Sequence, residues 1–127
     1  MDRSRASEKS PYFCRPLNDM GISDTNSLVR IVRLSFKEEH LDDFLQFYSR
    51  VQSQIAAFEG CLEVQAFRDN EQPNVIYTIS RWADAACLEN YRQSDLFRDI
   101  WARVSPWFDE KPQAFSLIPL RELARPA

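Results

Sequence analysis

The chain has 127 residues, which is enough for one domain with one hydrophobic core, and its apolar share of 44% is that of an ordinary globular protein. Its formal net charge of -3 excludes the clustered surplus of Lys and Arg that a nucleic-acid surface needs, so we expect no nucleic-acid partner. No apolar run approaches the roughly 20 residues that span a bilayer, and residues 1–27 hold no apolar segment of a secretory leader; we expect no membrane partner and a cytoplasmic protein.

Residues that commonly hold a metal or a cofactor are scarce. His40 is the single histidine, so a histidine-based metal cluster or a Ser-His-Asp triad is not expected. The three cysteines are too widely spaced for a CxxC metal pair, and two glycines cannot make a phosphate-cradling loop. The sequence therefore predicts no metal ligands and no cofactor.

The chain opens with a segment that lacks periodicity, followed by a β-branched run. Residues 1–27 are predicted to be an extended or disordered N-terminal arm, and residues 28–36 the first strand of a domain over residues 28–119. One phase of that strand is apolar except for Arg30. The other phase contains Val29, Ile31, Arg33 and Ser35. Arg33 is thus expected on the same mixed surface as Gln65 and Thr78.

A helix is predicted next, ending at Gly60. Ser35, followed three residues later by Glu38, resembles a capping box at its start. Three-and-four spacing then gives one buried stripe. The stripe consists of Leu41, Phe44, Leu45, Tyr48, Val51, Ile55 and Phe58. Gly60 would end the helix in the left-handed conformation that glycine adopts without steric cost.

Two alternating segments, residues 61–68 and 75–82, flank a turn-rich loop and predict an antiparallel hairpin. We assign the more apolar phase of each strand to the core. That face would hold Leu62, Val64, Ala66, Val75, Tyr77 and Ile79. The opposite, mixed face would hold Glu63, Gln65, Phe67, Ile76, Thr78, Ser80 and Trp82. Large apolar side chains on this mixed face predict that another surface covers it.

The last part of the domain reads as helix and strand. Asp84 can cap a helix from about residue 85, Ser94 can restart helical turns to about residue 104, and residues 114–118 alternate as a fourth strand before a short tail, 120–127. The order strand, helix, strand, strand, helix, strand predicts an α+β ferredoxin-like βαββαβ sandwich, a four-stranded antiparallel sheet with helices on one face. A second copy is the economical cover for the other face, so we expect a homodimer.

Several of these features together resemble the antibiotic biosynthesis monooxygenase domain family of the dimeric α+β barrel superfamily. The segment Gly60-Cys61-Leu62 opens the second strand, Trp82 ends the third, and an alanine-rich turn begins the next helix. Ser94 and Phe97 follow further along. The resemblance covers about residues 28–119 and implies that two sheets pack face to face in a dimeric barrel.

The resemblance also implies an activity, cofactor-independent oxygenation of a small aromatic or quinol-type compound. Trp82 matches the family's tryptophan, whereas Tyr91 stands where histidine is usual. A tyrosine with a pKa of about 10 is a poor general base near neutral pH, although it can donate a hydrogen bond to a phenolate. The catalytic candidates are Tyr91, Trp82 and Arg33. The candidates for substrate binding are Phe67, Gln65, Thr78 and Ser80.

Other interpretations stay open at this point. Each candidate residue could be an ordinary packed residue or a member of a salt bridge. The protein could be a non-catalytic dimeric module that binds a hydrophobic small molecule, or it could support isomerase or dehydratase chemistry. Haem degradation is less favoured, because the haem-degrading relatives carry an asparagine on the first strand and residues 28–36 contain none.

Overall fold

The computed structural model describes residues 27–120. The predicted arm, residues 1–27, and the predicted tail, residues 120–127, lie outside this part of the chain apart from their innermost residues. The strands are β1 (Leu28–Ser35), β2 (Cys61–Arg68), β3 (Val75–Trp82) and β4 (Gln113–Leu117). The helices are α2 (Leu41–Ala56), α3 (Ala85–Arg92) and α4 (Asp95–Val104), with the short 3₁₀ turns η2 (Glu38–His40) and η3 (Ser105–Trp107).

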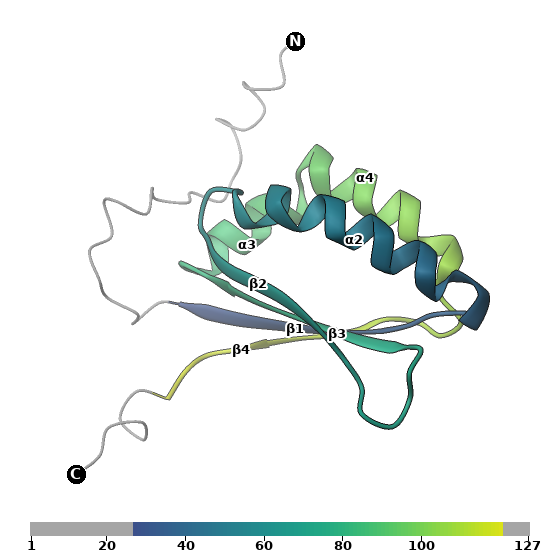
Figure 1. The fold of residues 1–127 in the computed structure, drawn as a ribbon. Coiled ribbons are helices and arrows are strands. Elements are labelled where there is room, and N and C mark those ends of the chain that lie inside the picture. The colour runs from purple at the N-terminus through teal and green to yellow at the C-terminus, as the bar shows by residue number, and fades with distance from the viewer. Residues whose placement is uncertain (1–26, 121–127) are drawn as a thin grey trace.

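The four strands form one antiparallel sheet in the order β2-β3-β1-β4. The helices α2, α3 and α4 cover one side of this sheet, and within residues 27–120 the other side carries no helix (Figure 1). The predicted ferredoxin-like α+β fold is therefore confirmed. Among the described residues, no helix is both long and apolar enough to cross a membrane.

Local sequence signals set most element boundaries. Gly60, with φ of 92°, adopts the left-handed conformation as predicted, but the predicted helix end is wrong, because α2 ends at Ala56 and a turn separates it from Gly60. The Asp84 side chain accepts a hydrogen bond from the Cys87 backbone N–H, and Ser94 accepts one from Phe97, so both predicted caps are confirmed.

The predicted capping box at Ser35 is wrong. Ser35 is the last residue of β1, and its hydroxyl donates to Asp109 Oδ1 at 2.6 Å. The backbone stays extended through Lys37, and Phe36 forms an isolated antiparallel bridge with Phe108. Helical structure then begins at Glu38, and α2 proper begins at Leu41.

The strand register corrects the predicted division of the hairpin into two faces. Ser80 is paired with Val64, and Thr78 with Ala66, so the polar phase of β3 shares a face with the apolar phase of β2. The register shifts by one residue between Cys61 and Glu63, which leaves Leu62 37% exposed in a β-bulge.

The side chains therefore sort differently from the expectation. The side of the sheet that faces the helices carries Arg30, Val32, Leu34, Val64, Ala66, Ile76, Thr78, Ser80 and Trp82. The open side carries Val29, Ile31, Arg33, Glu63, Gln65, Phe67, Tyr77, Ile79, Phe115 and Leu117. The predicted mixed face is thus divided between the two sides of the sheet.

Candidate functional site

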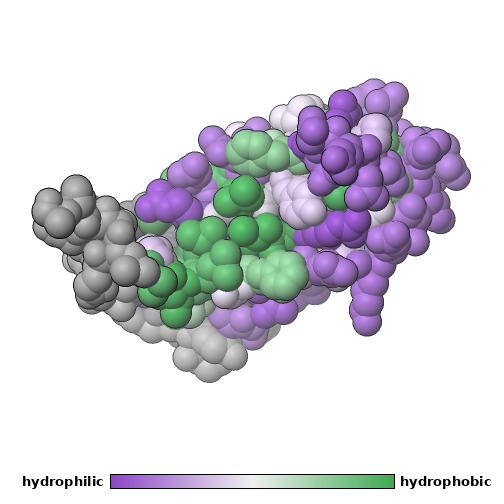
Figure 2. All heavy atoms as spheres, turned by 90° about the horizontal axis from the view of Figure 1, so that it is seen from below, coloured by the Kyte–Doolittle hydropathy of each residue, from purple (hydrophilic) through white to green (hydrophobic). Residues whose placement is uncertain are grey.

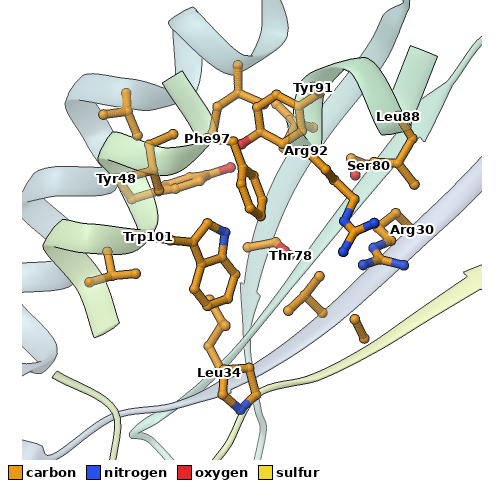
Figure 3. Close-up of a pocket in the computed structure, with 18 of the residues that line it drawn as sticks. Arg30, Leu34, Tyr48, Thr78, Ser80, Leu88, Tyr91, Arg92, Phe97 and Trp101 are labelled. Atoms are coloured by element: carbon orange, nitrogen blue, oxygen red, sulfur yellow. The ribbon is translucent and has the colours of Figure 1, made fainter. Parts of the chain in front are cut away.

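A cavity of about 400 Å³ lies between the helices and the sheet. Its walls are mostly aliphatic and aromatic, and they come from the four strands of the sheet and from α2, α3 and α4 (Figure 3). The polar side chains of the lining are Arg30, Tyr48, Thr78, Ser80, Tyr91 and Arg92, together with the indole of Trp82 and that of Trp101. This volume and character are typical of a site for a small, largely apolar organic molecule.

Trp82 forms one wall of the cavity and is held in a fixed orientation. It is 1% exposed, and its indole N–H donates to Ser80 Oγ at 3.0 Å. Its ring is stacked on Tyr91, with 5.1 Å between the ring centroids and 26° between the planes. Phe58 and Phe97 contact Tyr91 edge-on. The predicted residues Trp82, Tyr91 and Ser80 are therefore brought together.

Two phenol groups, those of Tyr48 on α2 and Tyr91 on α3, enter the cavity from the helix side, and their hydroxyls point toward one another in Figure 3. The Tyr48 hydroxyl is buried and has no hydrogen-bond partner among the described residues. Burial, followed by the neighbouring Cys61 thiol and Tyr48 phenol, raises the pKa of Tyr91 well above its usual value. Burial and Cys61 likewise raise the pKa of Tyr48. Both phenols are therefore neutral hydrogen-bond donors across the physiological pH range.

Two arginines line a different part of the cavity, and sequence reasoning did not assign either of them to the site. Arg30 projects from β1 toward the helices, and Arg92 comes from the last turn of α3. The sequence did contain a signal for Arg30, which interrupts an otherwise apolar phase of the first strand. A charged residue in an inward-facing series indicates either a functional site or a costly burial.

Three predicted site residues lie on the other side of the sheet. Arg33 forms an ion pair with Glu110 at 3.1 Å, and this contact, ahead of all other causes, raises the pKa of the guanidinium. Gln65 and Phe67 lie opposite Ile79 and Tyr77 on the open face, and Phe67 is 47% exposed. Within one chain these side chains do not reach the cavity. Thr78, in contrast, lines the cavity.

Possible metal ligands and bases are not gathered at this cavity. Among residues 27–120 no group of three His, Cys, Asp or Glu side chains is placed to hold a metal ion. His40 lies away from the lining residues, where its Nδ1 is 2.9 Å from Asp43 Oδ2 and its ring stacks on Trp107. The titratable groups in the described lining are two phenols and two guanidiniums, and all four keep their protons at neutral pH.

Comparison with solved structures finds the same fold in several distant proteins. A conserved protein from Methanosarcina mazei Go1 matches with a TM-score of 0.70 and 18% identity, over 74% of this chain and 93% of that one. A Pseudomonas aeruginosa protein matches with a TM-score of 0.68 and 18% identity, over 78% and 99%. A structure described as an antibiotic biosynthesis monooxygenase matches with a TM-score of 0.69 and 19% identity, over 73% and 98%.

At the level of sequence, no curated protein matches the chain. The model of the antibiotic biosynthesis monooxygenase family does match, over residues 27–103. This range contains β1, β2, β3, α2, α3 and nearly all of α4, and with them most of the cavity lining. The chain belongs to the antibiotic biosynthesis monooxygenase family.

Proposed function

We propose that the cavity binds a small aromatic or quinol-type compound and that the protein oxygenates it without a metal or flavin. The observation that carries the proposal is the pair of neutral phenol hydroxyls, Tyr48 and Tyr91, directed into a mostly apolar cavity of about 400 Å³. A phenolic or enolic oxygen of a bound ring is a suitable acceptor for these donors. Membership of the monooxygenase family favours oxygen chemistry in this space.

The reaction would rely on the substrate's own redox chemistry. An ionised phenol or enol gives one electron to dioxygen, and the resulting radical pair combines to form a hydroperoxide at carbon. In a substrate such as an anthrone, the reacting carbon is a CH₂ group in the keto form. Loss of water from the hydroperoxide converts this CH₂ to a carbonyl, so one CH₂ and one O₂ become one C=O and one H₂O. The protein's part is to enclose the anion and to donate hydrogen bonds to its oxygen.

The residues of the cavity divide these tasks. Tyr91 would donate to the phenolate oxygen, and Trp82 would form the wall against which the substrate ring packs. Thr78 and Ser80 would fix the position of the ring from the sheet side. Arg33 has no role in the proposed reaction, because its guanidinium pairs with Glu110 on the open side of the sheet.

One observation favours the second candidate, a module that binds a hydrophobic small molecule without catalysis. The described lining holds four titratable groups, and none of them accepts a proton at neutral pH. An enzyme with this lining has no base of its own, so its substrate must release the proton to solvent. A binding module has no such requirement.

Oxygen uptake with an anthrone and a hydroquinone panel tests the proposal. The wild-type protein should consume one dioxygen for each anthrone oxidised, and Tyr91→Phe should lower kcat by about tenfold or more because it removes a donor to the anion. Tyr77→Phe, on the open side of the sheet, is the matched control. Binding of the anthrone without oxygen uptake would refute the oxygenase and leave the binding module.

We also propose that two copies of the chain pack through the open side of the sheet. Apolar atoms gather in one area of this side in Figure 2. Phe115 and Leu117 of β4 are 51% and 47% exposed, although β4 is fully paired with β1. A patch of this kind is typical of an interface.

Sedimentation equilibrium tests this arrangement. It should give a dimer for the wild type and a monomer for Ile31→Lys. A wild-type monomer at micromolar concentration would refute the proposal.

A further inference from the structure

Two guanidinium groups lie together at one side of the cavity. Arg30 and Arg92 both line it, and Figure 3 shows their guanidinium groups next to each other, on the opposite side of the cavity from the hydroxyls of Tyr48 and Tyr91. The pKa of Arg30 is lowered, first by burial and then by the positive charge of Arg92, which places the two groups within electrostatic reach. The cavity therefore has a phenolic side and a cationic side.

The surrounding residues balance this charge only in part. Arg92 Nη1 is 2.9 Å from Glu89 Oε1, and Gln93 Nε2 donates to the second oxygen of Glu89 at 3.1 Å. Arg30 Nη1 donates to the neutral hydroxyl of Ser116 at 2.8 Å, and no carboxylate within residues 27–120 forms an ion pair with it. Two positive charges against one negative charge leave one positive charge in excess here.

A guanidinium that faces the helices without an ion-pair partner costs folding free energy unless an anion pairs with it. Like charges repel, and the partial burial of Arg30 removes some of its hydration. The remaining N–H groups of a guanidinium match a carboxylate in shape and can bind it through two parallel hydrogen bonds. A carboxylate carries one negative charge, which equals the local excess, whereas a phosphate monoester carries about 1.5 to 2 and would face Glu89.

We infer that the ligand of this cavity is an aromatic carboxylate, with its carboxylate between Arg30 and Arg92 and its ring directed toward Tyr48 and Tyr91. This inference rests on the proposed function, since it takes the cavity as the ligand site, and it goes further by naming the chemical class of the ligand. The two arginines fix one end of the molecule. The ring oxygen is then presented to the phenols at the other end.

Matched ligands that differ only in the anionic group test the inference. Calorimetric titration is carried out with hydroxynaphthoic acid, with naphthol and with hydroxynaphthyl phosphate, so that all three ligands carry a free ring hydroxyl. The wild type should bind the carboxylate about tenfold or more tightly than naphthol, because a hydrogen-bonded charge pair is added. The preference should weaken as salt is added, since one end of the cavity is open at Arg92, whose side chain is 43% exposed.

Substitutions assign the preference to the two arginines. Arg30→Gln and Arg92→Gln should each remove most of the tenfold preference and leave naphthol binding unchanged. Arg98→Gln, on the outer surface of α4 with its side chain 61% exposed, is the matched control and should change neither affinity. Because Arg92 is an exposed helix residue, Arg92→Gln should fold. It can therefore test the inference by itself if Arg30→Gln does not fold.

The possible results distinguish failure of this inference from failure of the proposed function. Equal affinity for the carboxylate and naphthol in the wild type, or tighter binding of the phosphate, would overturn the inference and leave the cavity as an aromatic site. A carboxylate preference that survives in both arginine variants would also overturn it. If neither the carboxylate nor naphthol binds, the proposed function fails together with the inference.

Discussion

Tyr48 offers the sharpest test of the site, because its hydroxyl is buried without a hydrogen-bond partner among the described residues. A buried hydroxyl in that state costs about 1–3 kcal/mol relative to one that is hydrogen-bonded. Tyr48→Phe removes the hydroxyl and keeps the ring, whose stacking on Phe44 at 5.8 Å is unaffected. We therefore expect the ligand-free protein to become more stable by about 1 kcal/mol, with Tm rising by about 4–8 °C for a domain of roughly 100 residues.

Urea and thermal unfolding of the ligand-free variant measure this effect, and Tyr77→Phe on the open side of the sheet should stay within about 0.5 kcal/mol of the wild type. The same Tyr48→Phe variant should lose affinity for a phenolic ligand, since the hydroxyl is kept for that ligand at a cost in stability. A variant that is less stable than the wild type would refute the reasoning, because it would mean that the hydroxyl is already satisfied.

Three further predictions concern the frame around the cavity. Ser80→Ala should cost about 1–3 kcal/mol in urea unfolding, because the indole N–H of Trp82 is then buried without an acceptor; an unchanged midpoint would show that the bond is unimportant. Gly60→Ala should destabilise by about 1 kcal/mol or more at a φ of 92°, which circular dichroism melts can check. The raised pKa of Tyr91 means that the unfolded state ionises first, so the contribution of Tyr91 to stability should be constant below about pH 10 and fall above it, by up to roughly 1.4 kcal/mol per pH unit. Tyr91→Phe should flatten this alkaline decline, and an identical decline in the variant would assign it to other groups.

The fold could be predicted because its signals are local. Asp84 and Ser94 cap the two helices that the sequence assigned to them, and Gly60 ends the turn before β2. Alternation within each strand and apolar periodicity within each helix then leave few possible topologies. The chain order of the elements was enough to give the sheet and the layer of helices above it.

The division of the sheet into faces could not be predicted in the same way. Alternation separates two faces within one strand, but only the register relates the faces of two strands, and the β-bulge beside Leu62 shifts that register by one residue. Its apolar residues alone predict that the phase of β3 with Val75, Tyr77 and Ile79 faces the core. The helix-facing phase is in fact the one with Thr78 and Ser80, because it lines a cavity and not a close-packed core.

The cavity also explains why Arg30, and not Arg33, lies at the candidate site. An arginine is unexpected on a face that packs against helices. The sequence therefore predicts a functional role for the polar residues of the opposite phase. On the wall of a cavity, in contrast, a polar group is expected, since it can form a hydrogen bond or an ion pair with a ligand. Arg30 breaks the apolar series of β1 at the point where the cavity lies, and the exception in the pattern was the better pointer to the site.

The titratable groups in the described lining have one property in common, which is that they donate hydrogen bonds or carry positive charge at neutral pH. Tyr48 and Tyr91 present neutral hydroxyls, and Arg30 and Arg92 present guanidiniums. Such an environment favours the ionised form of a bound phenol over the neutral form, because the anion is the better acceptor for the hydroxyl groups of Tyr48 and Tyr91. In the proposed function the cavity would thereby promote ionisation without a base of its own, by lowering the pKa of the ligand and releasing the proton to solvent.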